Sequence, residues 1–388
     1  MARRISIFGS TGSIGQQTID LIERKAAEFN VVAISGGGNI DLLAAQAKIL
    51  NPQYVITAFS EKNDELIARC SDLDVTCLAG REALLAAAME PVDWAMSAIV
   101  GFAGLEVSLR LATHGTTLAL ANKESLVCGG SLLTDTCLEH GTVLLPVDSE
   151  HSAIFQTLNG EKRSEIDRVI ITASGGPFRS WTREAMENVT PAQAANHPKW
   201  SMGQRISIDS ATLFNKALEV IEAKEFFNFS PSQIEVIIHP QSIIHSMLGF
   251  VDQAVLAHLG VPDMRGAIGY ALYYPDRKPL PVAPLDLAML GRLDFEAPDE
   301  VKFPALRLAR EVMEEGGLAG AVLNGAKEAS MDAFLDGDAK FLDMADFVER
   351  ALQDPAWSKF GDAQQIDAII AADTWSRNYV RTLTEAER

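Results

Sequence analysis

Two acidic residues stand two positions apart where the apolar run of LPVDSEH, residues 145–151, ends. In an extended backbone, residues i and i+2 point to the same side, so Asp148 and Glu150 are expected to converge on one point. Two carboxylates on one face repel each other unless a cation or a shared proton lies between them. Hard divalent cations such as Mg²⁺ and Mn²⁺ take all-oxygen ligands of this kind. The alternative is a solvated strand end, and the acidic pair alone does not decide between them.

A glycine-rich turn, GSTGSIG at residues 9–15, follows the first apolar run and opens the first helical pattern. Glycines permit a tight turn and the close approach of a pyrophosphate to a helix N-terminus. The spacing is GxxGxxG instead of GxGxxG, but the strand–turn–helix context is the one that a nucleotide site requires. The second strand ends in SGGGN at residues 35–39, without the Asp or Glu that an NAD site uses for the ribose hydroxyls. Small residues there leave room for a 2′-phosphate and favour NADP.

Three further segments place polar residues beside predicted strands or glycines. Lys123, in ANKES after the strand 117–119, is expected at the ligand-facing edge of a parallel sheet, where it can polarise a substrate oxygen. Ser174 precedes a Gly-Gly-Pro turn whose amides suit a phosphate. Trp200, in HPKWSMG, is a candidate lid residue that excludes water. The plain alternatives are a surface lysine, an ordinary turn and a tryptophan that packs on its own domain.

The segment DSATLFNKALE, residues 209–219, begins like a capped helix. Asn215 and Glu219 lie four residues apart and therefore share one face, with Lys216 beside them. Such a cluster suits a phosphate plus a metal, whereas the alternative is an exposed face with an i,i+3 Lys–Glu pair. The histidines in or beside apolar strands are interpreted as structural: His239, His245 and His258.

The order of elements predicts an α/β protein. Short apolar runs alternate with helical patterns in the first third, which is typical of a parallel sheet covered by helices on both faces. The expected strands are 5–8, 31–34, 54–57, 94–97, 117–119 and 143–147. The expected helices between them are 14–29, 40–50, 63–69, 81–88 and 104–113. The middle section predicts an α+β domain with strands 169–173, 234–238, 246–249 and 255–259 and a helix at 210–226.

The bulk composition limits the partners. The net charge of −19 argues against nucleic acid or an anionic membrane surface, because phosphate backbones attract clustered Lys and Arg. The cysteines show no CxxC pair, which favours reduced, mostly buried thiols: Cys70, Cys77, Cys128 and Cys137. With no signal-peptide pattern and no apolar stretch that would span a bilayer, a cytoplasmic location is expected.

Taken together, these segments resemble the 1-deoxy-D-xylulose 5-phosphate reductoisomerase family over essentially the whole chain. The most specific parts are GSTGSIG, ANKES and LPVDSEH, and SGGPF at 174–178, HPKWSMG and DSATLFNKALE add to them. The fold expected is an N-terminal Rossmann-like domain, a central α+β catalytic domain and a C-terminal helical bundle. The expected boundaries are 1–150 for the NADPH-binding domain, 151–274 for the catalytic domain with a lid near 196–204, 275–300 for a linker and 301–388 for the helical domain.

The resemblance implies roles for individual residues. The metal ligands are Asp148, Glu150 and Glu219, which with Lys123 form the catalytic set. The substrate-binding set is Ser149, Glu150, Ser174, His197, Trp200, Ser210, Asn215, Lys216 and Glu219, with Met202 beside Trp200 near the nicotinamide. The cofactor-binding set is Thr11, Gly12, Ser13, Ile14, Gly37, Gly38, Asn39, Asn122, Glu124 and Gly203. Many family members have a basic residue where Gly38 stands, so the margin of NADPH over NADH is expected to be narrower here.

The implied reaction is the isomerisation and reduction of 1-deoxy-D-xylulose 5-phosphate to 2-C-methyl-D-erythritol 4-phosphate in the non-mevalonate isoprenoid pathway. Its expected cofactors are NADPH and Mg²⁺ or Mn²⁺, with Co²⁺ as a third candidate, and the family suggests a homodimer. Two other hypotheses remain: a metal-dependent NADP oxidoreductase acting on a simple hydroxy acid, and a catalytically silent NADP-sensing regulator. The first leaves the phosphate-binding segments without a role, and the second predicts an eroded acidic triad.

Overall fold

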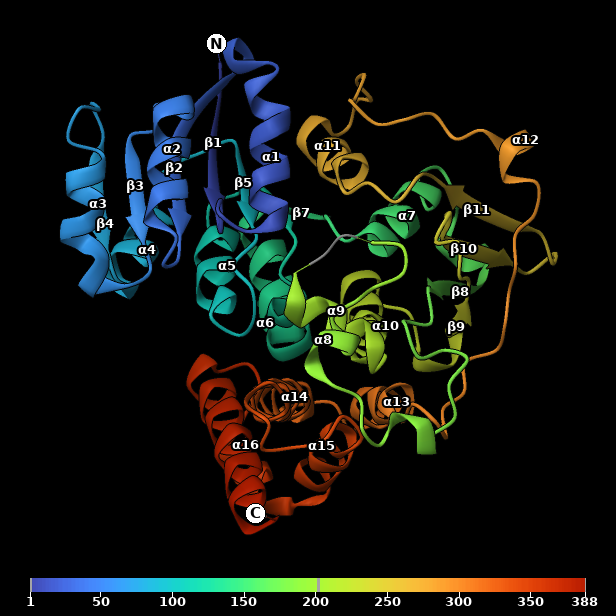
Figure 1. Cartoon of the computed structure of the whole chain (residues 1–388). Helices are drawn as coiled ribbons and strands as arrows, with labels where there is room; N and C mark the ends of the chain where they lie inside the picture. Colours follow the sequence, from blue (N-terminus) through green and yellow to red (C-terminus); the bar gives the residue numbers. More distant parts are fainter. Residues whose placement is uncertain (1, 201–202, 388) are drawn as a thin grey trace. The chain divides into compact units, whose positions relative to one another are not determined.

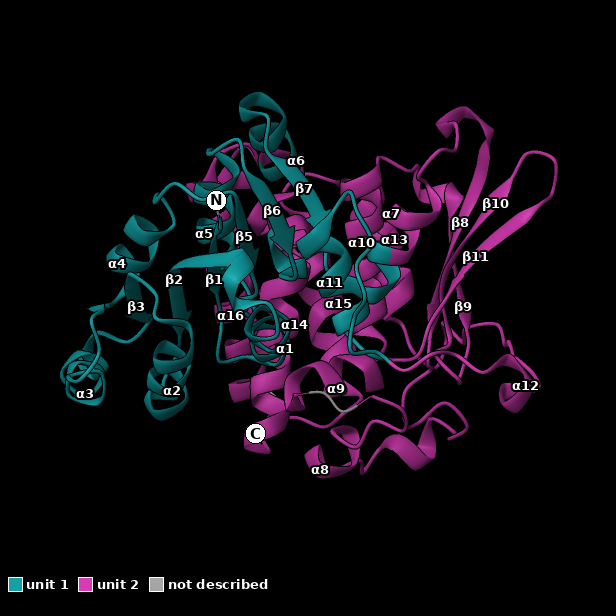
Figure 2. Ribbon diagram, turned by 90° about the horizontal axis from the view of Figure 1, so that it is seen from above, with its two compact units in different colours: residues 1–125, 133–152, 263–282 teal, residues 126–132, 153–262, 283–388 magenta. Residues whose placement is uncertain are grey.

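The computed structural model describes residues 2–200 and 203–387. Ser201 and Met202, which belong to the predicted lid, lie outside the described residues. The chain forms two compact units, which Figure 2 colours separately. Unit 1 contains residues 1–125, 133–152 and 263–282, and unit 2 contains residues 126–132, 153–262 and 283–388. The chain therefore passes between the units more than once, and the boundaries expected for the functional domains stay a prediction.

Unit 1 is built on a parallel sheet in the order β4-β3-β2-β1-β5-β6-β7. Its strands are Arg3–Phe8 (β1), Phe29–Gly36 (β2), Tyr54–Thr57 (β3), Thr76–Ala79 (β4), Trp94–Ser97 (β5), Thr117–Leu120 (β6) and Val143–Pro146 (β7). The strand order changes direction between β1 and β5. In open parallel sheets, ligands bind at such a switch point, beyond the carboxyl ends of the strands.

Helices connect these strands, as the alternating pattern predicts. They are Ser13–Glu23 (α1), Ile40–Leu50 (α2), Asn63–Arg69 (α3), Arg81–Ala87 (α4) and Gly104–Ala112 (α5). Lys123–His140 (α6) and Ser149–Thr157 (α7) begin in unit 1, and Arg265–Tyr273 (α11) returns to it late in the chain. The indole N–H of Trp94 donates to the Ala271 carbonyl at 3.0 Å, which ties α11 to the sheet.

Strand β4 and helix α6 are among the elements of this unit that were not predicted. Strand β4 is short and carries no fully buried residue, so its apolar pattern is weak. Helix α6 contains the pair Gly129-Gly130, and Gly130 has a non-helical backbone (φ +23°) that kinks the helix. Glycines inside a helix lower its propensity and obscure the periodic pattern. The predicted helix 14–29 is also too long, because Phe29 already begins β2.

Unit 2 holds a smaller sheet in the order β11-β10-β8-β9 (Figure 1). Its strands are Ile166–Ala173 (β8), Ile234–Ile238 (β9), Ile244–Phe250 (β10) and Val255–Leu259 (β11). Strands β8 and β9 are parallel, whereas β10 runs antiparallel to both β8 and β11. This mixed sheet confirms the predicted α+β character of the middle section.

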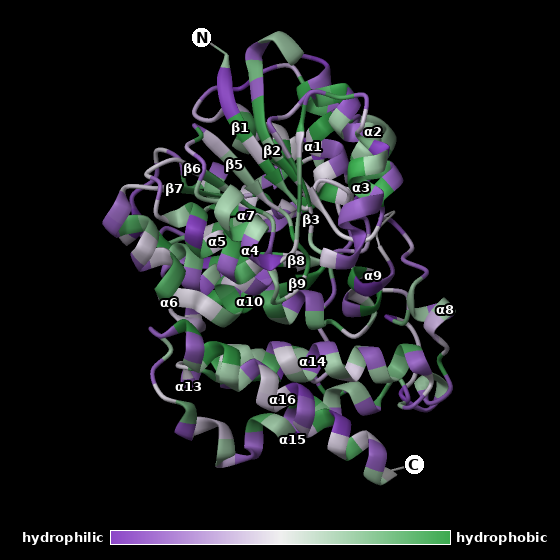
Figure 3. Cartoon of the chain, turned by 90° about the vertical axis from the view of Figure 1, so that its left-hand side faces the viewer, coloured by the Kyte–Doolittle hydropathy of each residue, from purple (hydrophilic) through white to green (hydrophobic). Residues whose placement is uncertain are grey.

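Helices form the rest of unit 2, and the predicted C-terminal bundle is confirmed. The helices are Pro191–Ala194 (α8), Gln204–Ala211 (α9), Phe214–Phe227 (α10), Leu287–Leu290 (α12), Ala305–Glu315 (α13), Ala319–Asp336 (α14), Asp343–Gln353 (α15) and Ile366–Glu387 (α16). In Figure 3, apolar and polar segments alternate along α14, α15 and α16. Helix α14 is buried on most of its surface, so it forms the centre of the bundle. Among the described residues, no helix is both long and apolar enough to cross a membrane.

The predicted helix 210–226 is in fact two helices. Leu213 adopts a left-handed backbone (φ +63°) between α9 and α10. A left-handed residue with a side chain is costly, and it persists only where its surroundings hold it. Leu213 is 3% exposed, so its side chain is anchored in the core. The break turns α10 away from α9 and sets the direction in which Asn215 and Glu219 point.

Candidate functional site

The glycine-rich turn after β1 divides its glycines between two tasks. Gly9 has φ +90°, and a Cβ at this position would lie 2.4 Å from the Ala98 carbonyl oxygen. A Cβ at Gly15 would lie 2.3 Å from the Gly9 oxygen, so packing also requires glycine there. Gly12 is different, because its backbone is ordinary and a Cβ would meet only the Gly9 oxygen at 3.4 Å. The fold itself therefore does not require glycine at position 12. A ligand that approaches the backbone closely would require it, because a side chain there would block the approach.

Helix α1 begins at this turn with its first amides available. Its N-cap, Gly12, makes no side-chain capping bond, and the described first turn holds no acidic residue. The first N–H groups of a helix have no partner within the helix, and together with the helix dipole they favour an anion. The predicted cofactor residues of this turn are at least partly accessible: Thr11, Gly12, Ser13 and Ile14.

The loop after β2 carries the second predicted cofactor segment. Gly38 and Asn39 are exposed and Gly37 is partly exposed. The Asn39 side chain accepts a hydrogen bond from the Leu42 amide at 3.1 Å and caps α2. Asn39 therefore has a structural task as well. A Cβ at Gly38 would meet only the Phe59 ring at 3.5 Å, so the loop tolerates a side chain at this position.

Asn122 is committed to the protein more fully than the sequence indicated. Its amide nitrogen donates to the carbonyls of Ile99 (2.7 Å) and Gly101 (2.9 Å) and to the Glu124 carboxylate (2.7 Å). Its oxygen accepts from the Ser125 amide at 2.9 Å and caps α6. Asn122 thus joins the ends of β5 and β6 at the carboxyl edge of the sheet, and its predicted contact with the cofactor stays a prediction.

The acidic motif lies at the start of a helix, so the predicted extended geometry is wrong. Strand β7 ends at Pro146 and α7 begins at Ser149. Asp148 acts as the helix cap: its Oδ1 accepts the Glu150 amide at 3.1 Å. A capping Asp with a carboxylate in the first turn is favourable at the positive end of a helix. The two acids are therefore neighbours across a cap, and the Ser149 hydroxyl donates to the Glu150 carboxylate.

Asp148 also forms an ion pair with a lysine of the same unit. The Lys123 Nζ lies 2.6 Å from Asp148 Oδ2, and both side chains are about nine-tenths buried. The buried His151 ring lies 3.2 Å from Asp148 Oδ1 through its Nδ1. Lys123 is the first residue of α6, which confirms its predicted place after β6. His151 was not singled out from the sequence, although its i,i+3 spacing from Asp148 would have indicated the contact.

Unit 2 supplies the second group of predicted residues. Asn215 donates to Glu219 Oε1 at 2.6 Å, and the Lys216 ammonium pairs with Glu219 Oε2. Glu219 is 0% exposed and Lys216 is 4% exposed. The alternative of an exposed Lys–Glu face is therefore wrong, although the pair itself is present. Burying a carboxylate is costly unless hydrogen bonds and a counter-charge compensate, and this cluster provides both.

Ser174 and His197 meet in the same unit. The Ser174 hydroxyl lies 2.8 Å from His197 Nε2 and also accepts the Gly176 amide at 3.2 Å. His197 Nδ1 accepts the amides of Lys199 (3.1 Å) and Trp200 (2.9 Å). Since Nδ1 is an acceptor, the ring proton sits on Nε2 and is donated to Ser174. The serine oxygen already accepts two bonds, so its own hydrogen is directed to a third group.

Trp200 lies at the end of the first described part of the predicted lid. Its ring is partly exposed and lies 6.3 Å from the His245 ring, measured between centroids. Gly203 is exposed and precedes α9 as its N-cap. The turn at Gly176 packs against the same helix, because a Cβ there would lie 2.8 Å from the Ser210 carbonyl oxygen. Ser174 and Ser210 are therefore brought to neighbouring turns.

Of the strand histidines, His239 has the structural contacts that were predicted, and the same interpretation of His245 and His258 stays a prediction. His239 is fully buried, bonds the Asp294 carbonyl at 2.9 Å and stacks on Phe295. His245 and His258 pack against each other on neighbouring strands. The four cysteines are free and three of them are buried, as predicted.

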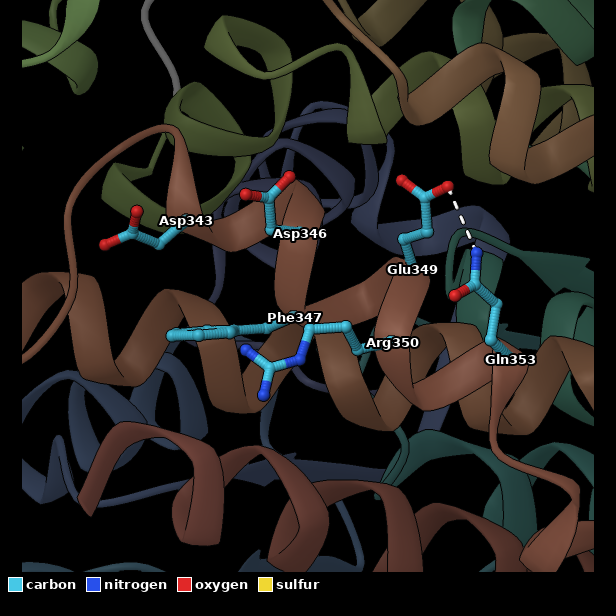
Figure 4. Close-up of a pocket in the computed structure, with 6 residues that line it drawn as sticks. All are labelled: Asp343, Asp346, Phe347, Glu349, Arg350 and Gln353. Atoms are coloured by element: carbon cyan, nitrogen blue, oxygen red, sulfur yellow. Dashed lines mark hydrogen bonds between the residues drawn. The ribbon is translucent and has the colours of Figure 1, made fainter. Parts of the chain in front are cut away.

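A separate surface pocket lies along α15 (Figure 4). Its lining comes from this one helix: Asp343, Asp346, Phe347, Glu349, Arg350 and Gln353. None of the motif residues lines it. Its acids and bases share one exposed helix face, which favours a solvated surface over a ligand site.

The hydrogen bonds of the half-buried His197 ring predict a pH-dependent contribution to stability. Burial lowers the pKa of His197 below its ordinary value, so the folded protein holds the neutral ring. Between the folded and unfolded pKa values the unfolded chain binds more protons, and stability falls as pH falls. We expect wild type to exceed His197→Gln in stability by about 1 kcal/mol above pH ~6.5, and this difference to shrink below it. Melting curves of both proteins between pH 5 and 8 would check this, and a difference that is constant with pH would contradict it.

Comparison with known proteins assigns the chain to a family. Residues 5–130 match the model of the 1-deoxy-D-xylulose 5-phosphate reductoisomerase domain. Residues 144–227 and 259–379 match models of the C-terminal domains of the same enzyme. The 1-deoxy-D-xylulose 5-phosphate reductoisomerase of Ruegeria pomeroyi is 56% identical over 96% of this chain and 93% of its own length. That of Sinorhizobium medicae is 54% identical over 97% of this chain and 96% of its own length.

Solved structures agree with these relatives. The Zymomonas mobilis reductoisomerase in complex with NADPH superimposes with a TM-score of 0.92 at 43% identity, covering 99% of this chain and 100% of that one. A reductoisomerase in complex with NADPH, fosmidomycin and magnesium gives a TM-score of 0.94 at 39% identity, covering 99% of this chain and 98% of that one. The chain belongs to the 1-deoxy-D-xylulose 5-phosphate reductoisomerase family.

Proposed function

We infer that this chain catalyses the NADPH- and divalent-metal-dependent conversion of 1-deoxy-D-xylulose 5-phosphate to 2-C-methyl-D-erythritol 4-phosphate, a step of the non-mevalonate isoprenoid pathway. The observation that carries this function is the agreement of motif and geometry over nearly the full length of relatives with this activity. The alternative of a catalytically silent regulator predicts that the acidic residues are lost. They are present, and Asp148 and Glu219 make specific contacts, which argues against that alternative.

We propose that unit 1 binds NADPH at the switch point between β1 and β5. The uncapped amides of α1 and the accessible turn at Gly12 suit the pyrophosphate. The exposed loop at Gly38 carries no acidic side chain, and its open space suits the 2′-phosphate. The remaining predicted contacts with the cofactor are Asn122 and Glu124 of this unit and Gly203, a residue of unit 2.

We propose Asp148, Glu150 and Glu219 as ligands of one Mg²⁺ or Mn²⁺ ion. All three offer carboxylate oxygens, the donor type that these hard cations prefer. Glu219 fits this role because a fully buried carboxylate needs positive charge nearby. The bound metal would supply Lewis-acid polarisation of substrate oxygens, and bound NADPH would supply hydride. Lys123, which pairs with Asp148, would stabilise negative charge that develops on a substrate oxygen, and Ser149 would contact a second substrate oxygen.

We propose that Ser174, Ser210, Asn215 and Lys216 bind the substrate phosphate. The Ser174 hydroxyl accepts from His197 and from the Gly176 amide, so its hydrogen is available for a phosphate oxygen. Because His197 also accepts the amides of Lys199 and Trp200, the ring links the phosphate pocket to the start of the lid. A substrate that orders Ser174 would therefore also stabilise the backbone at Trp200, which covers the substrate and excludes water.

We propose a homodimer that uses the outer strand of the small sheet. Strand β11 pairs only with β10 in the described sheet, which leaves its other edge unpaired. Its exposed side chains include Val255 (47%), Leu256 (44%) and Leu259 (37%). An exposed apolar edge strand is an aggregation hazard unless another surface covers it, and a second copy is the simplest cover.

We also propose a cytoplasmic location for the protein. The cysteines form no disulfide and three of the four are buried, which supports a reducing compartment.

The metal assignment predicts the result of Glu219→Gln. A neutral amide is a poorer ligand for a hard cation, so we expect turnover to fall by about a hundredfold or more while NADPH binding is retained. The matched control is Glu225→Gln, the same substitution on the same helix, which should keep its activity. NADPH oxidation with 1-deoxy-D-xylulose 5-phosphate, measured with and without added Mn²⁺, gives the readout. Full activity of Glu219→Gln at saturating Mg²⁺ would remove this residue from the metal site.

The loop after β2 predicts the cofactor preference. We expect NADPH to be used more efficiently than NADH, and Gly38→Arg to widen the ratio of kcat/KM values by about tenfold through pairing with the 2′-phosphate. The position has room for the side chain, since Phe59 is its nearest neighbour. Gly38→Met controls for bulk without charge and should leave the ratio unchanged. A wild-type preference for NADH would overturn the proposal.

The dimer proposal predicts the effect of a charge on β11. Leu256→Lys should shift the protein from dimer to monomer, because like charges would meet and an apolar contact would be lost. The control is Val301→Lys, at a residue of the same unit that is 87% exposed and lies outside the sheet. Sedimentation velocity of the three proteins at matched concentration is the measurement. A wild-type protein that sediments as a monomer would refute the dimer.

A further inference from the structure

A buried ion pair joins the helix that carries Ser210 to the centre of the C-terminal bundle. Lys327 Nζ on α14 lies 3.0 Å from Asp209 Oδ2 on α9. The two side chains are 3% and 11% exposed. The residues lie 118 positions apart in the sequence. Neither of them is among the proposed metal, substrate or cofactor ligands.

The pair is energetically demanding. Burial raises the pKa of the Asp209 carboxyl, and the charge of Lys327 opposes this shift. The second carboxylate oxygen, Asp209 Oδ1, makes no hydrogen bond among the described residues. A buried pair of this kind is weak evidence for stability, because the loss of hydration offsets the Coulomb attraction. Its retention at this position is better explained by what it holds in place.

A second ion pair runs between the same two helices. Arg205, one turn before Asp209 on α9, bonds Asp332 on α14 at 2.6 Å. This pair is exposed, so solvent screens it and its contribution to stability is small. The exposed pair and the buried pair thus join the same helices but differ in burial, which makes them a natural test and control.

Helix α14 is itself fixed within the bundle. Arg377 on α16 bonds Glu328, the neighbour of Lys327, at 2.7 Å and clamps Asp373 through Nε (2.7 Å) and Nη2 (3.1 Å). The two helices also approach closely at Gly325, where a Cβ would lie 2.2 Å from the Ser376 hydroxyl. Lys327 therefore extends from a rigid support.

What Lys327 holds is the end of α9. Asp209 directly precedes Ser210, whose carbonyl lies against the Gly176 turn, and Gly176 in turn donates to Ser174. Helix α9 ends at Ala211. The left-handed Leu213 is the N-cap of α10, and it therefore orients Asn215 and Lys216. Three of the proposed phosphate ligands, Ser210, Asn215 and Lys216, thus closely follow Asp209 in the chain, and the fourth, Ser174, belongs to the turn that packs against Ser210.

We propose that Lys327 is a positioning residue for the substrate phosphate: through Asp209 it fixes α9, and with it Ser210, against the Ser174 turn. This inference rests on the proposed function of the same site. It gives the C-terminal helices a part in substrate binding, although none of their residues is assigned to the phosphate. A shift of about 1 Å in such a support is enough to change rates by up to a hundredfold.

The test compares three variants with wild type. Lys327→Met keeps the length of the side chain and removes its charge, and we expect it to raise the KM for 1-deoxy-D-xylulose 5-phosphate by about tenfold or more. The KM for NADPH should rise far less, staying within about twofold, because the turn at Gly12 and the loop at Gly38 lie in unit 1 and only Gly203 of the proposed cofactor contacts adjoins α9. Lys327→Arg keeps a cation and should recover most of the loss. Asp332→Asn, which breaks the exposed pair, should leave both KM values unchanged.

A further variant guards against misfolding. Asp209→Asn combined with Lys327→Met leaves no unpaired buried charge, yet it also lacks the ionic contact, so its KM for the sugar phosphate should stay raised. A normal KM for this substrate in the folded single or double variant overturns the proposal, as does an equal rise in the KM for NADPH. A calorimetric titration with inorganic phosphate separates the positioning role of Lys327 from the proposed function. If wild type does not turn over the sugar phosphate, the proposed function fails, whereas weaker phosphate binding by Lys327→Met still supports the positioning role.

Discussion

The cost of burying a carboxylate governs this structure more than any other constraint. Asp148, Glu219 and Asp209 each lie mostly or fully out of water, and each is paired with a lysine. An unpaired charge in such surroundings would be neutralised or would destabilise the fold. The lysines offset the cost of burial without occupying every carboxylate oxygen, since Asp209 Oδ1 makes no hydrogen bond among the described residues. Charged groups that are desolvated and held in place are what catalysis on a phosphorylated sugar requires.

Local backbone geometry places these charges. Asp148 caps α7, so its carboxylate is fixed by the same amides that start the helix. The left-handed backbone of Leu213 separates α9 from α10. This conformation is strained, and the burial of the Leu213 side chain stabilises it. The kink at Gly130 belongs to the same group, since a Cβ there would lie 3.0 Å from the Glu225 carboxylate. The cap at Asp148 and the break at Leu213 therefore lie next to residues of the proposed site.

The two units use different means to prepare a ligand site. Unit 1 offers backbone amides, because a glycine turn leads into a helix N-terminus without a side-chain cap, a geometry that suits phosphate. Unit 2 offers side chains in two sets of hydrogen bonds, one between Ser174 and His197 and one that joins Asn215 and Lys216 to Glu219. The first mode tolerates variation in side chains, whereas the second depends on the bundle that supports it. The acidic character of the whole chain is compatible with both, because backbone amides and a few placed cations can bind a phosphate locally whatever the net charge.

The sequence alone determined the class of fold, the order of the main strands and the identity of the polar motifs. These follow from local patterns: apolar runs, glycine turns and i,i+4 spacing act over a few residues, and the chain cannot satisfy them otherwise. The tertiary structure decided the rest. Whether Asp148 and Glu150 lay on a strand or at a helix cap depended on where β7 stopped pairing with β6. Whether Lys216 and Glu219 were exposed depended on what packed over α10. The pair of Asp209 and Lys327 had no sequence signature at all, because residues 118 positions apart become neighbours only when separate helices pack.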